Sequence, residues 1–211
     1  MIDLQKIDNI IFDLGGVLFD IDYHLSANAF EELGIPDFKK LYSQAHQNDW
    51  FDNFEIGKIN QQELLAYLHE HIPGNHQDAD FIRCWNAMLL GMEPVKFETL
   101  KKIRPHFKLF LLSNANELHL PQVERMIEEK NPGQTLQAHF DQLYFSHLIG
   151  LRKPHPESFL KIIHDHQLNI KRTLFLDDSI QHVEGAKAIG LNAALITKDF
   201  NTEVVFSQFL L

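Results

Sequence analysis

The chain has 211 residues, of which 45% are hydrophobic, and its formal net charge is −10. This length and apolar content allow one substantial domain, or a core domain with a smaller insert, and they exclude a disordered or fibrous chain. The acidic balance disfavours nucleic acid and anionic membrane surfaces as partners, although a small phosphorylated metabolite can still bind where a lysine, a helix N-terminus or a cation makes a local positive site.

The features that indicate a cellular location point to the cytoplasm. Cys84 is the only cysteine, so no intrachain disulfide can form. Residues 1–6 lack the basic region and long apolar stretch of a secretion signal, and no apolar run approaches the ~20 residues that cross a bilayer. We therefore expect a soluble cytoplasmic protein without a membrane partner. The sequence does not indicate its oligomeric state.

The first predicted strand, Ile10 to Asp13, is followed by a long segment with helical patterns and no convincing strand, roughly residues 18–92. A helix over Ala27 to Leu33 ends at Gly34, with Pro36 just beyond, and Asn60 opens a helix over Gln61 to His71 through a capping box. Between these helices lies the aromatic run Trp50-Phe51-Asp52-Asn53-Phe54, which we assign to internal packing rather than to substrate contact.

From about residue 93 the pattern alternates between strands and helices. The expected strands are Lys108 to Asn114, a weaker run Gln142 to Ser146, Thr173 to Asp178, and Asn192 to Thr197. The expected helices are Pro121 to Lys130, Pro156 to Gln167, and His182 to Ile189 with Gly190 as its C-terminal cap. Strands that are apolar throughout are typical of a parallel sheet covered by helices on both faces. The sequence thus predicts an α/β core over residues 1–17 and 93–211, and an inserted helical cap over residues 18–92.

Polar side chains follow several of these strands, at the sheet edge where open α/β folds bind their ligands. Asp13, Ser113 with Asn114, and Asp177 with Asp178 all end strands, and Lys153 lies in a loop ahead of a helix. Each residue has an ordinary explanation when taken singly, as a turn residue, a helix cap, a surface charge or a loop residue. Their order along the chain is more informative.

That order resembles the four-motif pattern of the haloacid dehalogenase superfamily, over about residues 8–20 and 93–197. The motifs are Phe12-Asp13-Leu14-Gly15-Gly16-Val17, Leu112-Ser113-Asn114, Arg152-Lys153-Pro154, and Leu176-Asp177-Asp178-Ser179 followed by Glu184-Gly185-Ala186. The resemblance implies a Rossmann-like core whose helical cap is inserted after the first motif. It also implies a phosphatase in which the first aspartate becomes a phosphoaspartate that water then cleaves.

The resemblance also implies a role for each motif residue. Asp13 would be the nucleophile, and Mg²⁺ would bind one Asp13 oxygen, the backbone carbonyl of Gly15 and the Asp178 carboxylate, with Asp177 acting through a water. Lys153 would pair with Asp13 and with the phosphate, keeping the nucleophile ionised. Ser113 would donate a hydrogen bond to a phosphate oxygen, and Asn114 belongs to the same substrate-binding group.

The chain departs from this pattern at Gly15, where most phosphatases of the superfamily carry a second aspartate that transfers protons. A general acid-base group contributes ~10²- to 10⁴-fold in rate, so its absence favours a substrate with a good leaving group, such as a sugar 1-phosphate. The first motif and the run Ser113 to Asn116, with His119, are similar to a branch that contains an α-D-glucose-1-phosphate phosphatase. Candidate replacements for the missing group are Asp20, Asp22 and His119, but Asp20 and Asp22 fit better as caps at the hinge into the helical segment.

Two alternatives stay open. A 2-haloacid dehalogenase also lacks the second aspartate, but its pattern has an aromatic residue in place of Gly15, no acidic magnesium-site pair, and an early cap arginine, whereas the first arginine here is Arg83. A phosphate-binding or regulatory protein without turnover would not need the nucleophile.

His155 is interpreted as a loop residue.

Overall fold

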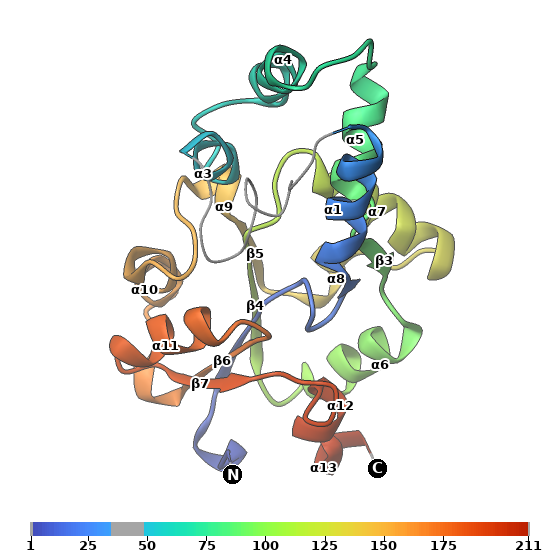
Figure 1. The fold of residues 1–211 in the computed structure, drawn as a ribbon. Coiled ribbons are helices and arrows are strands. Elements are labelled where there is room, and N and C mark those ends of the chain that lie inside the picture. The colour runs from blue at the N-terminus through green and yellow to red at the C-terminus, as the bar shows by residue number, and fades with distance from the viewer. Residues whose placement is uncertain (1, 35–48, 211) are drawn as a thin grey trace.

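The structure is a computed structural model that describes residues 2–34 and 49–210. Within these residues a parallel five-stranded sheet lies between helices, and a group of further helices lies at one end of the molecule (Figure 1). The strands are β1 (Asn9–Phe12), β4 (Lys108–Ser113), β5 (Gln142–Phe145), β6 (Thr173–Asp177) and β7 (Asn192–Leu195). These bounds confirm all five predicted strands to within one or two residues.

The strand order is β5-β4-β1-β6-β7, so the chain leaves β1 toward one side of the sheet and later returns to build the other side. Phe12 pairs with Leu111 of β4 and with Leu176 of β6. The carboxyl end of β1 is therefore a topological switch point, the position at which open α/β sheets bind ligands.

Both faces of the sheet are buried, which explains why the strands are apolar throughout. Ile10 and Phe12 pack on one face against α6 (Pro94–Ile103) and α7 (His119–Lys130). Ile11 packs on the other face against α10 (Pro156–Asp165) and α11 (Ile180–Ala188). Figure 1 shows these two pairs of helices on opposite sides of the strands.

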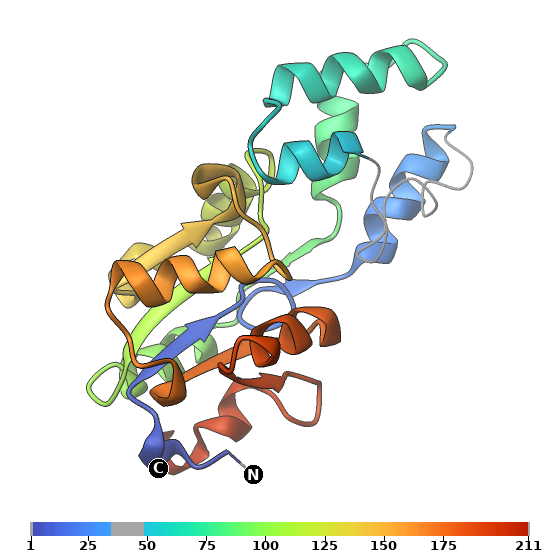
Figure 2. The same ribbon diagram turned by 90° about the vertical axis from the view of Figure 1, so that its left-hand side faces the viewer.

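The helices α1 (Tyr23–Glu32), α3 (Asp49–Glu55), α4 (Gln61–His71) and α5 (Asp78–Asn86) lie together beyond the carboxyl end of the sheet, as Figure 2 shows. They share a separate hydrophobic cluster that contains Phe30, Phe51, Phe54 and Trp85. Phe51 and Phe54 are almost fully buried, which confirms the internal packing expected of these two rings, whereas Trp50 is exposed and stacks on Tyr67. The division of the chain at residues 18 and 92 stays a prediction.

The expectation that residues 18–92 contain no strand is wrong. Two short strands, β2 (Asp20–Ile21) and β3 (Leu89–Gly91), pair antiparallel where the chain leaves and re-enters the core. The physical reason is their length, because two or three residues are too few to show an alternating pattern. The pairing of β2 with β3 holds the two ends of the helical segment next to each other.

The helix boundaries follow the local capping residues. The helix expected from Ala27 begins earlier, at Tyr23, because the Asp22 side chain caps it by accepting a hydrogen bond from the His24 backbone N–H at 2.9 Å. This confirms the capping role expected of Asp22, whereas Pro36 lies outside the described residues. The Asn60–Glu63 capping box of α4 is also confirmed.

The other helices agree with expectation apart from their ends. α7 and α11 each begin two residues before the predicted start, and α10 ends at Asp165, shortly before Gln167 adopts a positive φ of 52°. Gly190 has a φ of 85° after α11, as a C-terminal cap requires. The remaining short elements are η1 (Leu4–Lys6), α8 (Leu136–His139), α9 (Ser146–Ile149), η2 (Ile170–Arg172), α12 (Thr202–Val205) and α13 (Ser207–Leu210). Among the described residues, no helix is both long and apolar enough to cross a membrane.

Candidate active site

The strand ends bring the motif residues together at the switch point. Asp13 directly follows β1, Ser113 is the last residue of β4, and Asp177 is the last residue of β6. The Asp13 backbone N–H continues the sheet by donating a hydrogen bond to the Leu176 carbonyl at 2.9 Å. Because β4 and β6 are the two neighbours of β1, the three side chains meet at one edge.

Lys153 links two of these carboxylates. Its Nζ atom lies 2.6 Å from Oδ1 of Asp13 and 2.7 Å from Oδ2 of Asp177. The lysine is fully buried, and the ring of Phe175 lies 5.5 Å from its ammonium group. A buried ammonium ion needs such partners, because charge is expensive to remove from water without them. Lys153 is thus held against the candidate nucleophile in the way that the resemblance implies.

Asn114 holds the loop that carries this lysine. Its Nδ2 atom donates to the Lys153 carbonyl at 3.0 Å, and its Oδ1 atom accepts from the Lys153 backbone N–H at 3.1 Å. The side-chain amide is therefore engaged with the backbone, a supporting role that the motif did not indicate. Asn114 also lines the cavity described below, and its expected contact with substrate stays a prediction.

Ser113 is oriented by the turn that follows β4. Its hydroxyl oxygen accepts a hydrogen bond from the Ala115 backbone N–H at 3.1 Å, and the residue is 3% exposed. A serine hydroxyl accepts and donates at the same time, so its proton remains available to an anion in the cavity.

The carboxylates repel one another, and their electrostatics favour a cation. Burial, followed by the charge of Asp177, raises the pKa of Asp13 to about 6 against the opposing effect of Lys153. Burial, Asp13 and Asp177 together raise the pKa of Asp178 to about 7. Burial disfavours the charged form of Lys153, but the Asp13 and Asp177 carboxylates outweigh it and raise the pKa of the lysine. One lysine faces three carboxylates, so a bound cation would lower the repulsion that remains.

Asp177 is the most engaged of the three carboxylates. Its pKa is lowered although burial opposes its charge, because Lys153 and His182 lie against it. Its Oδ1 atom also accepts a hydrogen bond from the Ser179 backbone N–H at 2.8 Å. The structure thus shows Asp177 positioning Lys153, and its expected contact with magnesium through a water stays a prediction.

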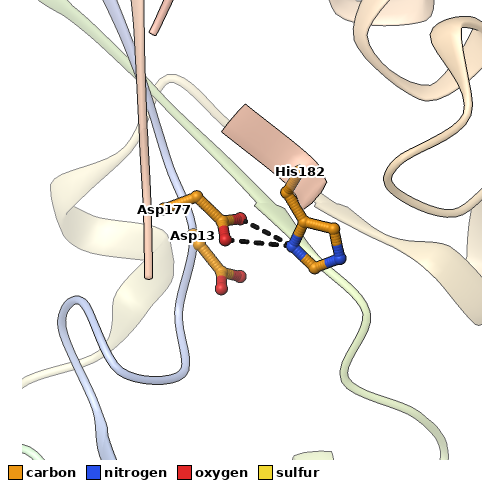
Figure 3. A group of neighbouring side chains, drawn as sticks. All are labelled: Asp13, Asp177 and His182. Carbon is orange, nitrogen blue, oxygen red and sulfur yellow. Dashed lines mark hydrogen bonds and ion pairs between the residues drawn. The ribbon is translucent and has the colours of Figure 1, made fainter. Parts of the chain in front are cut away.

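His182 is a member of the site that the sequence analysis did not identify. Its Nδ1 atom lies 2.9 and 3.1 Å from the two carboxylate oxygens of Asp177. Figure 3 shows the imidazole ring facing this carboxylate. One ligand atom each from Asp13, Asp177 and His182 lie within 4.8 Å of one another. His182 lies one helical turn beyond Asp178, in the first turn of α11, and this spacing is the signal that could have revealed it.

The oxygen-rich donor set fits a hard divalent cation. Mg²⁺ prefers carboxylate and carbonyl oxygens and retains several waters, so a few protein ligands are enough. Gly16 leaves room for Asp178, because a Cβ atom built on Gly16 would lie 2.2 Å from Asp178 Oδ2. Gly15 lines the same cavity as Asp13. The roles of these residues as ligands stay predictions.

A cavity that is open to solvent lies over this edge of the sheet. Its wall includes Asp13, Ser113 and Lys153 from the core, and also Tyr23 and Glu55 from the helical segment. Among the candidate replacements for the acid-base group, His119 lines this cavity, whereas Asp20 and Asp22 do not. His155 precedes α10 as its N-terminal cap residue, in agreement with its interpretation as a loop residue.

Comparison with known proteins identifies relatives over most of the chain. A D-ribitol-5-phosphate phosphatase of Bacteroides thetaiotaomicron is 29% identical over 184 residues, which are 87% of this chain and 89% of that protein. A sesquiterpene phosphatase of Aspergillus oryzae is 25% identical over 203 residues, which are 95% of each chain. Both relatives are named as phosphatases. Neither is similar enough in sequence for its substrate to be assigned to this chain.

Solved structures agree with the fold. A haloacid dehalogenase family enzyme of Bacteroides thetaiotaomicron, crystallised as a mutant in complex with magnesium and inorganic phosphate, superposes with a TM-score of 0.84 at 25% identity, covering 90% of this chain and 94% of that one. An L-2-haloacid dehalogenase superposes with a TM-score of 0.62 at 19% identity, covering 96% and 98%, a likeness in fold alone.

The family model for haloacid dehalogenase-like hydrolases matches residues 7–190, a span that contains all four motifs and every side chain of the site. The match covers the helical segment and four of the five strands of the sheet, and it ends just before β7. This chain is therefore an enzyme of the haloacid dehalogenase-like hydrolase family.

Proposed function

We propose that the protein is a magnesium-dependent phosphatase that hydrolyses a small phosphate monoester through a phosphoaspartate on Asp13. The observation that carries this proposal is the contact of the Lys153 ammonium group with Asp13 at 2.6 Å, inside a cavity that Ser113 also lines. A nucleophilic carboxylate, a fixed positive charge and a hydroxyl donor are the protein groups that phosphoryl transfer needs.

In the first step an oxygen of Asp13 attacks phosphorus, the bond between phosphorus and the leaving oxygen breaks, and the leaving oxygen takes up a proton from solvent water. Water then attacks the acyl phosphate, which releases inorganic phosphate and restores the carboxylate. Lys153 offsets the charge that builds on the phosphoryl oxygens, and Ser113 donates a hydrogen bond to one of them. The Asp177 and Asn114 contacts keep Lys153 in place during both steps.

Asp13, the Gly15 carbonyl and Asp178 would hold the magnesium ion, with Asp177 acting through a water. When bound, the ion neutralises the repulsion between the nucleophile and the phosphate. The raised pKa of Asp178, about 7, supports this arrangement because a cation beside it would favour the ionised form. The relative crystallised with magnesium and phosphate gives further support.

The substrate is proposed to be a small polyhydroxylated phosphate, such as a sugar or polyol phosphate. Gly15 leaves the site without the usual proton donor, which favours a good leaving group and thus a hexose 1-phosphate as the narrowest hypothesis. The name of the ribitol phosphate relative supports the wider class, since ribitol is a polyol. The buried Cys84, the single cysteine of the chain and not part of a disulfide, supports the cytoplasmic location proposed for such an enzyme.

The test is a panel of phosphate esters assayed with and without Mg²⁺. We expect turnover that depends on the metal and that falls by ~10³-fold or more in Asp13→Asn. Asp8→Asn is the matched control, because Asp8 directly precedes the same strand but is exposed and paired with Arg172. Full activity of Asp13→Asn, or of the metal-free enzyme, would contradict the mechanism.

The same panel decides between the proposal and its alternatives. A protein that binds inorganic phosphate with Mg²⁺ but hydrolyses no ester would be a phosphate-binding or regulatory protein. Release of halide from a 2-haloacid without added metal would instead identify a dehalogenase.

A further inference from the structure

The wall of the catalytic cavity contains polar side chains that the proposed chemistry does not use. Glu55 comes from α3, Arg152 comes from the loop that carries Lys153, and His119 begins α7. They belong to segments far apart in the sequence, and one of them lies in the helical segment. A group of this kind, beside a phosphate site, is placed to contact the part of the substrate that leaves.

Glu55 and Arg152 form a buried ion pair across the boundary between the helical segment and the core. Nη2 of Arg152 lies 3.0 Å from Oε2 of Glu55, and the side chains are 13% and 5% exposed. Arg152 also pairs with Asp52 of the same helix. Burying such a pair brings little net stability, because desolvation offsets most of the attraction. Its place in a cavity wall is better explained by a ligand.

Arg152 and His119 each carry a buried nitrogen that lacks a hydrogen-bond partner among the described residues. These atoms are Nε of Arg152 and Nε2 of His119. Buried polar atoms are nearly always paired, with protein, ordered water or a ligand, so two exceptions on one cavity wall require an explanation.

His119 is suited to hydrogen bonding rather than to charge recognition. It is 7% exposed and stacks on Trp85, with ring centroids 6.0 Å apart. Burial lowers the pKa of His119 to about 4, although a hydrogen bond with the Trp85 backbone opposes this shift. The imidazole is therefore neutral at pH 7, and a neutral imidazole offers one donor and one acceptor.

We propose that Glu55, Arg152 and His119 form a subsite for the hydroxyl groups of a polyhydroxylated leaving group. This inference rests on the proposed function and names the residues that would select the substrate. A carboxylate has about four lone-pair positions, so Glu55 can accept from a substrate hydroxyl while it remains paired with Arg152. Arg152 donates, and His119 donates or accepts according to its tautomer.

An alkyl chain in the same place would remove water from the Glu55–Arg152 pair without replacing its hydrogen bonds. Sites built to bind a hydroxyl discriminate strongly against an analogue that lacks it, because their polar groups are left unpaired. The subsite therefore disfavours long apolar phosphates and favours polyol phosphates of similar length.

The test compares a pentitol phosphate with n-pentyl phosphate, two esters of equal chain length that differ in hydroxyl groups. We expect wild-type kcat/KM to be at least tenfold higher for the pentitol ester. Glu55→Gln and His119→Leu should each reduce this ratio severalfold or more, with the loss concentrated in the pentitol ester. Equal losses for both esters, or an unchanged ratio, would overturn the subsite.

Glu117→Gln is the matched control. Glu117 also joins the helical segment to the core, by accepting a hydrogen bond from the Gln61 backbone N–H at 2.8 Å, but it does not line the catalytic cavity. This variant should keep the wild-type ratio. If Glu55→Gln does not fold, as judged by thermal unfolding, Arg152→Lys tests the same pair.

A binding measurement separates failure of the subsite from failure of the proposed function. If the wild type hydrolyses neither ester nor p-nitrophenyl phosphate, the proposed function fails, and calorimetry with pentitol phosphate and pentyl phosphate then tests the subsite directly. Tighter binding of the pentitol ester that Glu55→Gln abolishes supports the subsite. Equal binding of the two esters contradicts it.

Discussion

Gly16 is in contact with Asp178, the residue proposed as a magnesium ligand. A Cβ atom on Gly16 would lie 2.2 Å from Oδ2, 2.4 Å from Cγ and 2.9 Å from Cβ of Asp178. The glycine also has a φ of 71°, in the left-handed region that other residues enter at a cost of roughly 1–2 kcal/mol. The first motif thus needs glycine here both for its backbone and for the space that Asp178 fills.

Gly16→Ala should move Asp178 out of its position and weaken magnesium binding. Even Cβ of Asp178 would be too close to the new methyl group, so rotating the carboxylate does not relieve the clash. We expect the Mg²⁺ concentration for half-maximal activity to rise tenfold or more. Gly133→Ala is the control, because Gly133 has a φ of 77° and none of the residues that the structure describes has an atom within 4 Å of the added Cβ. This variant should lose stability without changing the metal dependence. If both variants needed the same Mg²⁺ concentration for half-maximal activity, the proposed role of Asp178 as a magnesium ligand would be contradicted.

Lys153→Met should reduce both activity and stability. The substitution leaves Asp13 and Asp177 buried side by side without their common partner, and breaking a buried ion pair costs about 3–5 kcal/mol. We expect a loss of this size in urea unfolding at pH 7, together with loss of phosphate-ester turnover. Lys161→Met removes a surface lysine that lies 3.1 Å from Asp165, and should change stability by less than about 1 kcal/mol. Similar losses in the two variants would show that Lys153 does not hold the carboxylates as described.

The raised pKa of Asp178 predicts how the stability of the metal-free protein depends on pH. The carboxyl of the unfolded chain releases its proton near the ordinary aspartate pKa of 3.8, whereas the folded one keeps it up to about pH 7. Between these values the folded state binds more protons, so the contribution of Asp178 to the free energy of unfolding is fully present below pH 3.8 and is lost as the pH rises to about 7. The free energy of unfolding of the wild type minus that of Asp178→Asn should therefore fall by about 2–4 kcal/mol from pH 4 to pH 8.

The control for this titration is Asp165→Asn. The hydrogen bond from Lys161, followed by that from Tyr144, lowers the pKa of the Asp165 carboxyl. The free energy of unfolding of the wild type minus that of Asp165→Asn should rise as the pH increases through the range in which this carboxyl ionises. This change has the opposite sign to the one expected for Asp178→Asn. Chemical denaturation in EDTA at a series of pH values measures both differences. A flat or rising difference for Asp178→Asn would contradict the burial of its carboxyl among like charges.

Much of the core could be predicted from the sequence because each strand is buried on both faces. Ile10, Ile11 and Phe12 are all fully buried, so the run is apolar throughout and its end at Asp13 is sharp. The order of motif residues then placed the reactive side chains at one edge of the sheet. The contacts of Lys153 with Asp13 and Asp177 follow from this arrangement, although their distances could come only from the structure.

Other features have no local signal. The β2–β3 ribbon joins residues about seventy positions apart, and its strands are too short to show a period. The pairing of Glu55 with Arg152 depends on how α3 packs against the core, which the sequence of the helix does not indicate. In the sequence, Glu55 is one of several acidic residues of this helix. Asn114 shows the same limit, since nothing in its motif indicates that its side chain holds the backbone of Lys153.

The end of α3 is fixed to the core at Gly57, which predicts that a substitution outside the cavity alters substrate selection. Gly57 has a φ of 69°, and an added Cβ would lie 2.2 Å from the backbone carbonyl oxygen of His147. Two residues before Gly57, the Glu55 carbonyl accepts a hydrogen bond from the Ser146 hydroxyl at 2.5 Å. Because the clash is with backbone, Gly57→Ala must shift α3 relative to α9, and Glu55 moves with it.

We expect Gly57→Ala to reduce the kcat/KM ratio of pentitol phosphate to pentyl phosphate, and to lower stability by more than the roughly 1–2 kcal/mol of left-handed strain alone. Gly34→Ala supplies the comparison, because Gly34 also lies in the helical segment with a φ of 94° but has no atom of residues 2–34 and 49–210 within 4 Å of the added Cβ. Gly34→Ala should lose the stability that left-handed strain costs, without a change in the kcat/KM ratio of the two esters. Urea unfolding and the two-ester assay measure both effects. Loss of selectivity in Gly34→Ala, or its retention in Gly57→Ala, would mean that the docking of α3 on α9 does not set the position of Glu55.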